Sequence, residues 1–326
     1  MSEVTSNVTL IVPTVYHRAE LFAQTLKYFS HVGWRSPIIV SDHSPKEHLD
    51  AIRSIVGTFG DLNVRLRVDP PDAHFLARLV RCAEDAQTDY VHLHADDDFV
   101  AFATLARLFE VMERDPGCAA AMGVNIHFNI ATQGFAVLTK TGCTQPDAFT
   151  RLLSQLEKFS SVLYALRRRG EFIDSMSYAE AHCPDVQFWQ YLETCQAVLS
   201  GTVAIIDELH YARQVHAKKW SNQLVKERSP DHFPQLILSA HFQPRVAAFR
   251  TALVDSCARH EIAVDHTALD DGLIRLLHHG LGVMGLPDRR TTNELVSGQD
   301  QMMKRLQDAN DPARKAMIQI YEAISA

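Results

Sequence analysis

The sequence predicts an α/β protein with a mostly parallel, Rossmann-like sheet that is flanked by helices. Two observations support this class. Short β-branched runs alternate with helical stretches between residues 8 and 98, and such alternation requires right-handed crossovers between parallel strands. The expected strands at 8–12 and 38–40 are apolar at almost every position, which is typical of strands covered on both faces. From about residue 224 onward the apolar spacing is helical, so we expect a helical C-terminal appendage.

Each element of the first hundred residues follows from local pattern. The run from Val8 to Val12 predicts a buried strand that Pro13 closes, and helical spacing of apolar residues follows in 20–31. Pro45 suits the first turn of a helix. Further strands are expected at 38–40, 64–68 and 90–94, and a further helix at 75–86.

The later elements are less regular. A turn signal at 115–117 separates an expected helix at 103–112 from an expected strand at 119–128. The pattern weakens from 133 to 158, as expected for an acceptor-side insertion. We then expect a strand or buried segment at 160–166, a helix containing 188–195, a strand at 203–206, and helices within 232–257, 269–279 and 300–323.

Composition excludes several classes. The chain has 32 Lys and Arg against 39 Asp and Glu, a net charge of −7, so it lacks the basic footprint of a general nucleic-acid binder. No apolar run approaches the ~20 residues of a membrane span, and the N-terminus does not resemble a secretory signal. We therefore expect a cytoplasmic protein whose six scattered cysteines are reduced thiols.

Polar residues gather where the expected parallel strands end. The strand ends carry Pro13 and Thr14, Asp42, Asp69 with Asp72, and Asp96 to Asp98. Open parallel sheets bind ligands beyond the carboxyl ends of their strands. No glycine-rich fingerprint follows the first strand, which argues against a dinucleotide dehydrogenase and a P-loop NTPase.

Three consecutive aspartates repel one another and call for a cation. Hard divalent ions such as Mn²⁺ or Mg²⁺ take carboxylate oxygens as ligands, usually together with substrate phosphates. The alternative is a solvated acidic turn in which Asp98 caps the helix that follows.

Together, these motifs resemble the GT-A glycosyltransferases, in particular the inverting enzymes that are similar to family 2. The resemblance rests on Val-Pro-Thr followed by Arg18, on Ser-Asp-His-Ser around Asp42, and on the DxD-type run Asp96 to Asp98. It implies that Asp42 contacts the nucleotide base or ribose. It also implies donor-site roles for Pro13, Thr14, Arg18, Asp96 and Asp97, and a metal held by Asp96 and Asp98.

Two further residues enter through the same resemblance. Asp185 precedes a helix at the place where these enzymes carry the general base, although Pro184 stands where glutamate is common; capping of that helix is the alternative role. His216, in a region similar to the Tyr-Arg-x-His segment, would complete the metal shell, or lie on the surface. The triplet Arg167 to Arg169 is expected to face solvent, with contact to an anion as the alternative, and Lys218 and Lys219 either reach the diphosphate or face solvent.

The resemblance implies a catalytic domain at 1–222, with a nucleotide-sugar half at 1–100 and an acceptor half at 101–222, followed by the helical region 223–326. The expected activity is metal-dependent, inverting transfer of a sugar from a nucleotide sugar, with a UDP-sugar favoured, to an acceptor hydroxyl in glycan or polysaccharide biosynthesis. A lipid-linked acceptor would require peripheral association with the inner membrane face. The C-terminal helices are a candidate dimer contact.

Two alternatives remain open. A sugar-phosphate nucleotidyltransferase also uses metal-bound aspartates, but it would need a glycine-rich and basic loop after the first strand, where Tyr16, His17 and Arg18 stand. A non-catalytic scaffold that binds nucleotide sugars would keep the donor residues and form no product.

Overall fold

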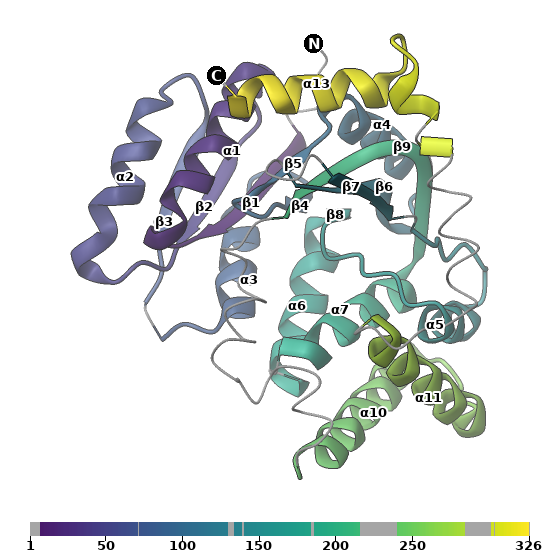
Figure 1. Cartoon of the computed structure of the whole chain (residues 1–326). Coiled ribbons are helices and arrows are strands. Elements are labelled where there is room, and N and C mark those ends of the chain that lie inside the picture. Colours follow the sequence, from purple (N-terminus) through teal and green to yellow (C-terminus); the bar gives the residue numbers. More distant parts are fainter. Residues whose placement is uncertain are drawn as a thin grey trace.

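The computed structural model describes residues 7–70, 72–129, 134–138, 140–183, 186–215, 240–283, 301–302 and 304–325. Figure 1 shows one curved sheet with helices on both faces. In chain order the elements are β1 (Val8–Thr14), η2 (Tyr16–Arg18), α1 (Ala19–His31), β2 (Ile38–Asp42), η3 (Lys46–His48), α2 (Leu49–Thr58), β3 (Val64–Val68), α3 (Phe75–Asp85), β4 (Tyr90–Leu93), β5 (Asp98–Val100), α4 (Phe102–Arg114), β6 (Cys118–Asn129), β7 (Gly134–Leu138), α5 (Ala148–Glu157), β8 (Leu166–Arg168), α6 (Arg169–His182), α7 (Val186–Ser200), β9 (Thr202–Gln214), α10 (Phe242–Arg259), α11 (His266–Val283) and α13 (Pro312–Ser325).

The sheet confirms the α/β class and refines its topology. Within the described residues its strand order is β3-β2-β1-β4-β8-β6-β9-β5, and β7 pairs with β6 at the side. The first four strands are parallel, as the sequence predicts. The second half is mixed, because β8 runs antiparallel to both β4 and β6 and β5 runs antiparallel to β9. The short connection from β6 to β7 likewise joins antiparallel neighbours.

Alternate residues of β1 face two separate apolar cores. Leu10 and Val12 pack with Phe22 of α1 on one face of the sheet, whereas Ile11 packs with Leu79 of α3 on the other. Burial on both faces explains why this strand is apolar at almost every position.

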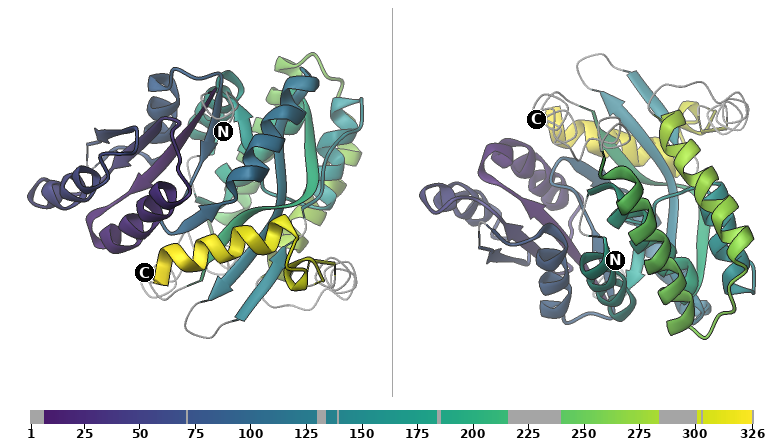
Figure 2. Two further views of the ribbon diagram at one scale, coloured as in Figure 1. Left: turned by 90° about the horizontal axis from the view of Figure 1, so that it is seen from above. Right: turned by 90° about the horizontal axis from the view of Figure 1, so that it is seen from below.

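The C-terminal helices join both cores. The last helix, α13, packs against α1 and β9, as the views in Figure 2 show, and its Ile320 is fully buried. On the other face, α10 packs against α7, and α11 packs against α5. Among the described residues, no helix is both long enough and apolar enough to cross a membrane. All six cysteines are buried, and none of them is in a disulfide.

The strand β5 corrects one expectation about Asp98. This residue begins β5 and pairs with Arg213 of β9, while α4 begins only at Phe102 with Ala101 as its N-cap. Asp98 therefore does not cap the following helix, and its position is fixed by the sheet.

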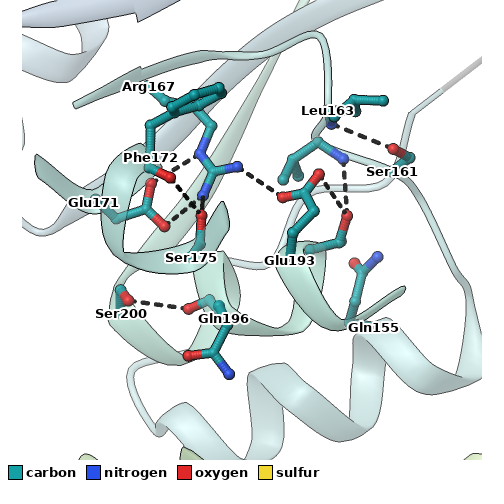
Figure 3. Close-up of polar contacts among 12 residues, drawn as sticks. Gln155, Ser161, Leu163, Arg167, Glu171, Phe172, Ser175, Glu193, Gln196 and Ser200 are labelled. Carbon is teal, nitrogen blue, oxygen red and sulfur yellow. Dashed lines mark hydrogen bonds and ion pairs between the residues drawn. The ribbon is translucent and has the colours of Figure 1, made fainter. Parts of the chain in front are cut away.

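Two residues of the basic triplet Arg167 to Arg169 do not face solvent as expected. Arg167 is fully buried and forms ion pairs with Glu193 of α7 at 2.7 Å and with Glu171 of α6 at 2.6 Å (Figure 3). Arg168 donates to the backbone oxygen of Met112 at 2.7 Å. The expectation that the triplet faces solvent is wrong for these two residues, because buried carboxylates and carbonyls compensate their charge.

Candidate functional site

The carboxyl ends of β1, β2 and β4 bring the expected donor residues to one edge of the sheet. Thr14 is paired in register with Asp42, and the His43 amide donates to the Thr14 carbonyl at 3.1 Å. The Thr14 hydroxyl donates to Asp96 Oδ2 at 2.7 Å, which links the end of β1 to the residues after β4. Pro13 precedes Thr14 within β1. This edge is where an open parallel sheet binds its ligand.

Arg18 is the counter-ion of the first two aspartates. Its Nη2 lies 2.6 Å from Asp96 Oδ1 and 2.8 Å from Asp97 Oδ2, and its Nε donates to Asp96 Oδ1 at 2.7 Å. Burial alone would lower the pKa of Arg18, but the two carboxylates raise it above its usual value. Burial raises the pKa of Asp96, and the contact with Arg18 opposes that rise. The guanidinium thus offsets part of the repulsion between adjacent carboxylates.

Asp98 has different surroundings. Its side chain is buried, its Oδ1 accepts from the backbone amide of Gln214 at 3.0 Å, and its Oδ2 lies 3.9 Å from Arg213 Nε. The pairing of β5 with β9 therefore places a second arginine beside the aspartate run.

The described residues do not by themselves form a divalent-metal site. Carboxylate oxygens are suitable ligands for Mn²⁺ or Mg²⁺, but Asp96 and Asp97 share the guanidinium of Arg18. No group of three His, Cys, Asp or Glu side chains within the described part of the chain is arranged to hold a metal ion. His216, the third expected ligand, lies outside the described residues, as do Asp185, Lys218 and Lys219.

Asp42 is held by one oxygen. Its Oδ1 accepts from the Ser44 amide at 2.9 Å and from the Ser44 hydroxyl at 2.5 Å. Its Oδ2 is buried and has no hydrogen-bond partner among the described residues. A buried carboxylate oxygen that lacks a partner is costly unless a ligand donates to it.

Arg78 is a candidate site residue that the sequence did not reveal. It lies on the first turns of α3, its side chain is almost fully buried, and its Nη1 lies 3.5 Å from the Ser41 hydroxyl. No described carboxylate forms an ion pair with it, and burial lowers its pKa. A cation in the first turns of a helix opposes the helix dipole. That placement is the one hint in the sequence, and it does not show that the guanidinium turns inward.

Tyr16, which lies between Thr14 and Arg18 in the chain, belongs to an aromatic pair. The ring of Tyr16 stacks on that of His48 with a centroid separation of 3.9 Å and an interplanar angle of 13°. Tyr16 is 37% exposed, so this stack presents a π surface at the end of β1. Nucleobases bind favourably to such surfaces.

A cavity of about 170 Å³ lies beyond Asp98, between β6, β9 and α7. Lys140 and Arg213 contribute positive charge to its wall. Burial and the neighbouring charge of Arg213 lower the pKa of Lys140 to about 8. The described lining residues are Met122, Asn125, His127, Leu138, Lys140, Ser161, Leu163, Tyr164, Gln190, Tyr211 and Arg213.

The network around Arg167 fixes α7, which follows Asp185 in the chain. Glu193 of α7 is joined to Arg167 of β8, and the neighbouring Thr194 hydroxyl accepts from the Val162 amide at 3.3 Å. Figure 3 shows these contacts holding α7 against β8 and the segment before it. These contacts fix the middle of the helix.

No protein-family model matches the chain, and no curated protein matches its sequence. Solved structures do match. The structure of S. aureus TarS 1–349 in complex with UDP-GlcNAc superposes with a TM-score of 0.53 at 10% identity, covering 98% of this chain and 89% of that one. A second structure of TarS 1–349 gives a TM-score of 0.51 at 12% identity with the same coverage. The chain spans 53% of the length of a longer TarS structure. At this identity the likeness concerns the fold, and the fold is that of the GT-A glycosyltransferases.

Proposed function

We propose that the protein is a glycosyltransferase that moves a sugar from a nucleotide-sugar donor to an acceptor hydroxyl. The observation that carries the proposal is the joining of Thr14, Arg18 and Asp96 at the carboxyl edge of the sheet, next to Asp42. A structure with the same fold, TarS 1–349, is in complex with UDP-GlcNAc. This supports a nucleotide sugar as the donor, and a UDP-sugar is the first candidate.

The donor site is proposed to divide into a base region and a diphosphate region. The unpartnered oxygen of Asp42 suits an N–H or hydroxyl of the base or ribose. Arg78, beside Ser41, and the stacked ring of Tyr16 are proposed as further contacts of this region. Arg18 and Arg213 lie beside the aspartates and are the proposed contacts of the diphosphate.

The proposed reaction inverts the anomeric centre. The acceptor oxygen attacks the anomeric carbon, the bond from that carbon to the phosphate oxygen breaks, and its electron pair leaves with the nucleoside diphosphate. A hydroxyl is a poor nucleophile until a base accepts its proton. Asp185, just before α7, is the proposed base.

The base assignment predicts a separation of binding from catalysis. Asp185→Asn removes the proton acceptor but keeps the size of the side chain, so transfer should fall at least 100-fold with donor affinity nearly unchanged. Asp174→Asn, at an exposed position of α6, is the matched control and should transfer normally. The readout is nucleoside diphosphate released in the presence of acceptor, and a fully active Asp185→Asn enzyme would contradict the assignment.

Metal dependence is a separate prediction. The same assay with Mn²⁺, with Mg²⁺ and with a chelator tests it directly. Activity only with a divalent ion would require ligands in addition to the carboxylates that Arg18 occupies, and His216 is the proposed one. Undiminished activity in chelator would assign the neutralisation of the diphosphate to arginine and lysine side chains.

The assay also separates the alternatives. A non-catalytic scaffold would bind a nucleotide sugar and release no nucleoside diphosphate with any acceptor. A nucleotidyltransferase would instead form pyrophosphate from a nucleoside triphosphate and a sugar phosphate.

A further inference from the structure

The cavity beyond Asp98 has a one-sided charge. Lys140 and Arg213 both line it, and no described carboxylate does. Arg213 is 3.9 Å from Asp98, so the cavity opens beside the proposed donor diphosphate. Among the described residues, Lys140 forms no ion pair, and its Nζ donates to the Ser161 carbonyl at 3.3 Å.

Of these two cations, Lys140 lacks a charged partner among the described residues, whereas Arg213 lies beside Asp98. Two positive side chains in one partly enclosed cavity repel each other, and the lowered pKa of Lys140 reflects burial together with that repulsion. A bound anion would remove the repulsion and hold the lysine in its charged form.

The remaining wall suits a sugar. Asn125 is only 6% exposed, and its buried Oδ1 has no hydrogen-bond partner in the described structure. Gln190 adds a second amide to the cavity wall, and Tyr164 and Tyr211 add aromatic surface. Amides that bond to hydroxyls, next to aromatic rings, are the groups expected around a carbohydrate ring.

We infer that this cavity binds an acceptor that carries a negative charge, a phosphate or a carboxylate on the accepting sugar. Lys140 and Arg213 contact the charge, and Asn125 and Gln190 contact the hydroxyls. The inference rests on the proposed function and names the substrate class of the same site.

The position of the cavity favours the acceptor over the donor as the source of the anion. The donor cluster is built from residues at the ends of β1, β2 and β4. The cavity is built from β6, β9, α7 and the segments around Lys140 and Ser161, all in the half of the chain that follows the aspartates. Arg213 adjoins both regions, so Lys140 is the residue that distinguishes them.

The test measures equilibrium binding by isothermal titration calorimetry to the full chain. The probes are glucose 1-phosphate, glucuronic acid and glucose, each with and without UDP or GDP. The variant is Lys140→Gln, and Lys304→Gln, at an exposed position, is the matched control. Thermal melting checks that both variants are folded.

The expected result is at least tenfold tighter binding of glucose 1-phosphate and glucuronic acid than of glucose. Lys140→Gln should weaken both anionic sugars at least tenfold, as expected for the loss of a hydrogen bond to a charged group, with nucleoside diphosphate affinity within twofold of wild type. Lys304→Gln should change neither affinity.

Two results would overturn this inference and leave the proposed function standing. If glucose binds as tightly as the anionic sugars while a nucleoside diphosphate binds normally, charge has no role in this cavity. Loss of nucleoside diphosphate affinity in Lys140→Gln would assign the cavity to the donor. If neither UDP nor GDP binds the wild-type chain, the proposed function fails and this inference fails with it.

Discussion

Asp42 shows how a single side chain can be prepared for a ligand. Ser44 fixes one carboxylate oxygen with two hydrogen bonds, and the second oxygen is left without a described partner. Asp42→Asn keeps the first oxygen but replaces the second with an amide donor. We expect nucleoside diphosphate affinity to fall at least tenfold, because a hydrogen bond to a charged acceptor contributes about 1.5–3 kcal/mol.

Calorimetric titration of the nucleoside diphosphate measures this effect. Asp50→Asn, whose side chain is fully exposed, is the control and should bind as wild type does. Equal affinity in Asp42→Asn and wild type would remove Asp42 from the donor site.

The sequence predicted which residues gather at the strand ends and missed those that only packing brings to the candidate site. Thr14, Asp42 and Asp96 were predictable because a parallel sheet places the ends of its strands at one edge. Arg78 was not, since nothing in the local pattern shows that its guanidinium turns inward. Lys140 was not either, because its neighbours come from distant parts of the chain.

At the scale of elements, a buried charge network fixes helix α7. The buried ion pairs of Arg167 join it to β8 and α6. Arg167→Met should destabilise the protein by about 3–5 kcal/mol, because it leaves the Glu193 carboxylate buried without a charged partner. Arg167→Met combined with Glu193→Gln should recover part of that loss.

Urea unfolding of the three proteins measures the free energies. A single variant as stable as wild type would show that α7 does not depend on this network. A double variant no more stable than the single one would show that packing, and not the unpaired charge, accounts for the loss.

At the scale of elements, periodicity was informative where the sheet is parallel and weak elsewhere. The first four strands and their helices agree with the prediction. Helix α6 was not predicted, although its buried residues Phe172, Met176 and Ala179 recur at helical spacing. The strand β5 is only three residues long and gains its partner from β9, more than a hundred residues away in sequence.

The whole molecule should lose stability in mild acid. His92 and His210 are fully buried with their Nε2 atoms 3.1 Å apart. Burial lowers the pKa of both rings, that of His210 to about 3. In the unfolded chain both titrate near pH 6.5, so below that pH the unfolded state binds protons that the native state does not.

The free energy of unfolding should therefore fall as the pH drops from about 6.5 to 5, by up to about 1.4 kcal/mol per pH unit for each histidine. Urea unfolding at several pH values measures the slope. His210→Gln should have a slope shallower by about one proton. An unchanged slope in that variant would contradict the assignment of the buried, neutral pair.

The fold class and the edge where the strand ends meet could be predicted from the order of the elements. The packing of the C-terminal helices could not. Helical periodicity predicted helices near the C-terminus. It did not predict that α13 packs on β9 and on α1, which is near the opposite end of the chain. Such contacts depend on tertiary complementarity, which a local pattern does not encode.

The most direct test of the central claim is calorimetric titration of a panel of nucleotide sugars and nucleoside diphosphates into the wild-type chain, with Mn²⁺ and with chelator. The account predicts that one nucleotide binds at a single site and that Asp42→Asn weakens it. Failure of every nucleotide to bind, with or without metal, would contradict the account and leave the GT-A fold without a donor site.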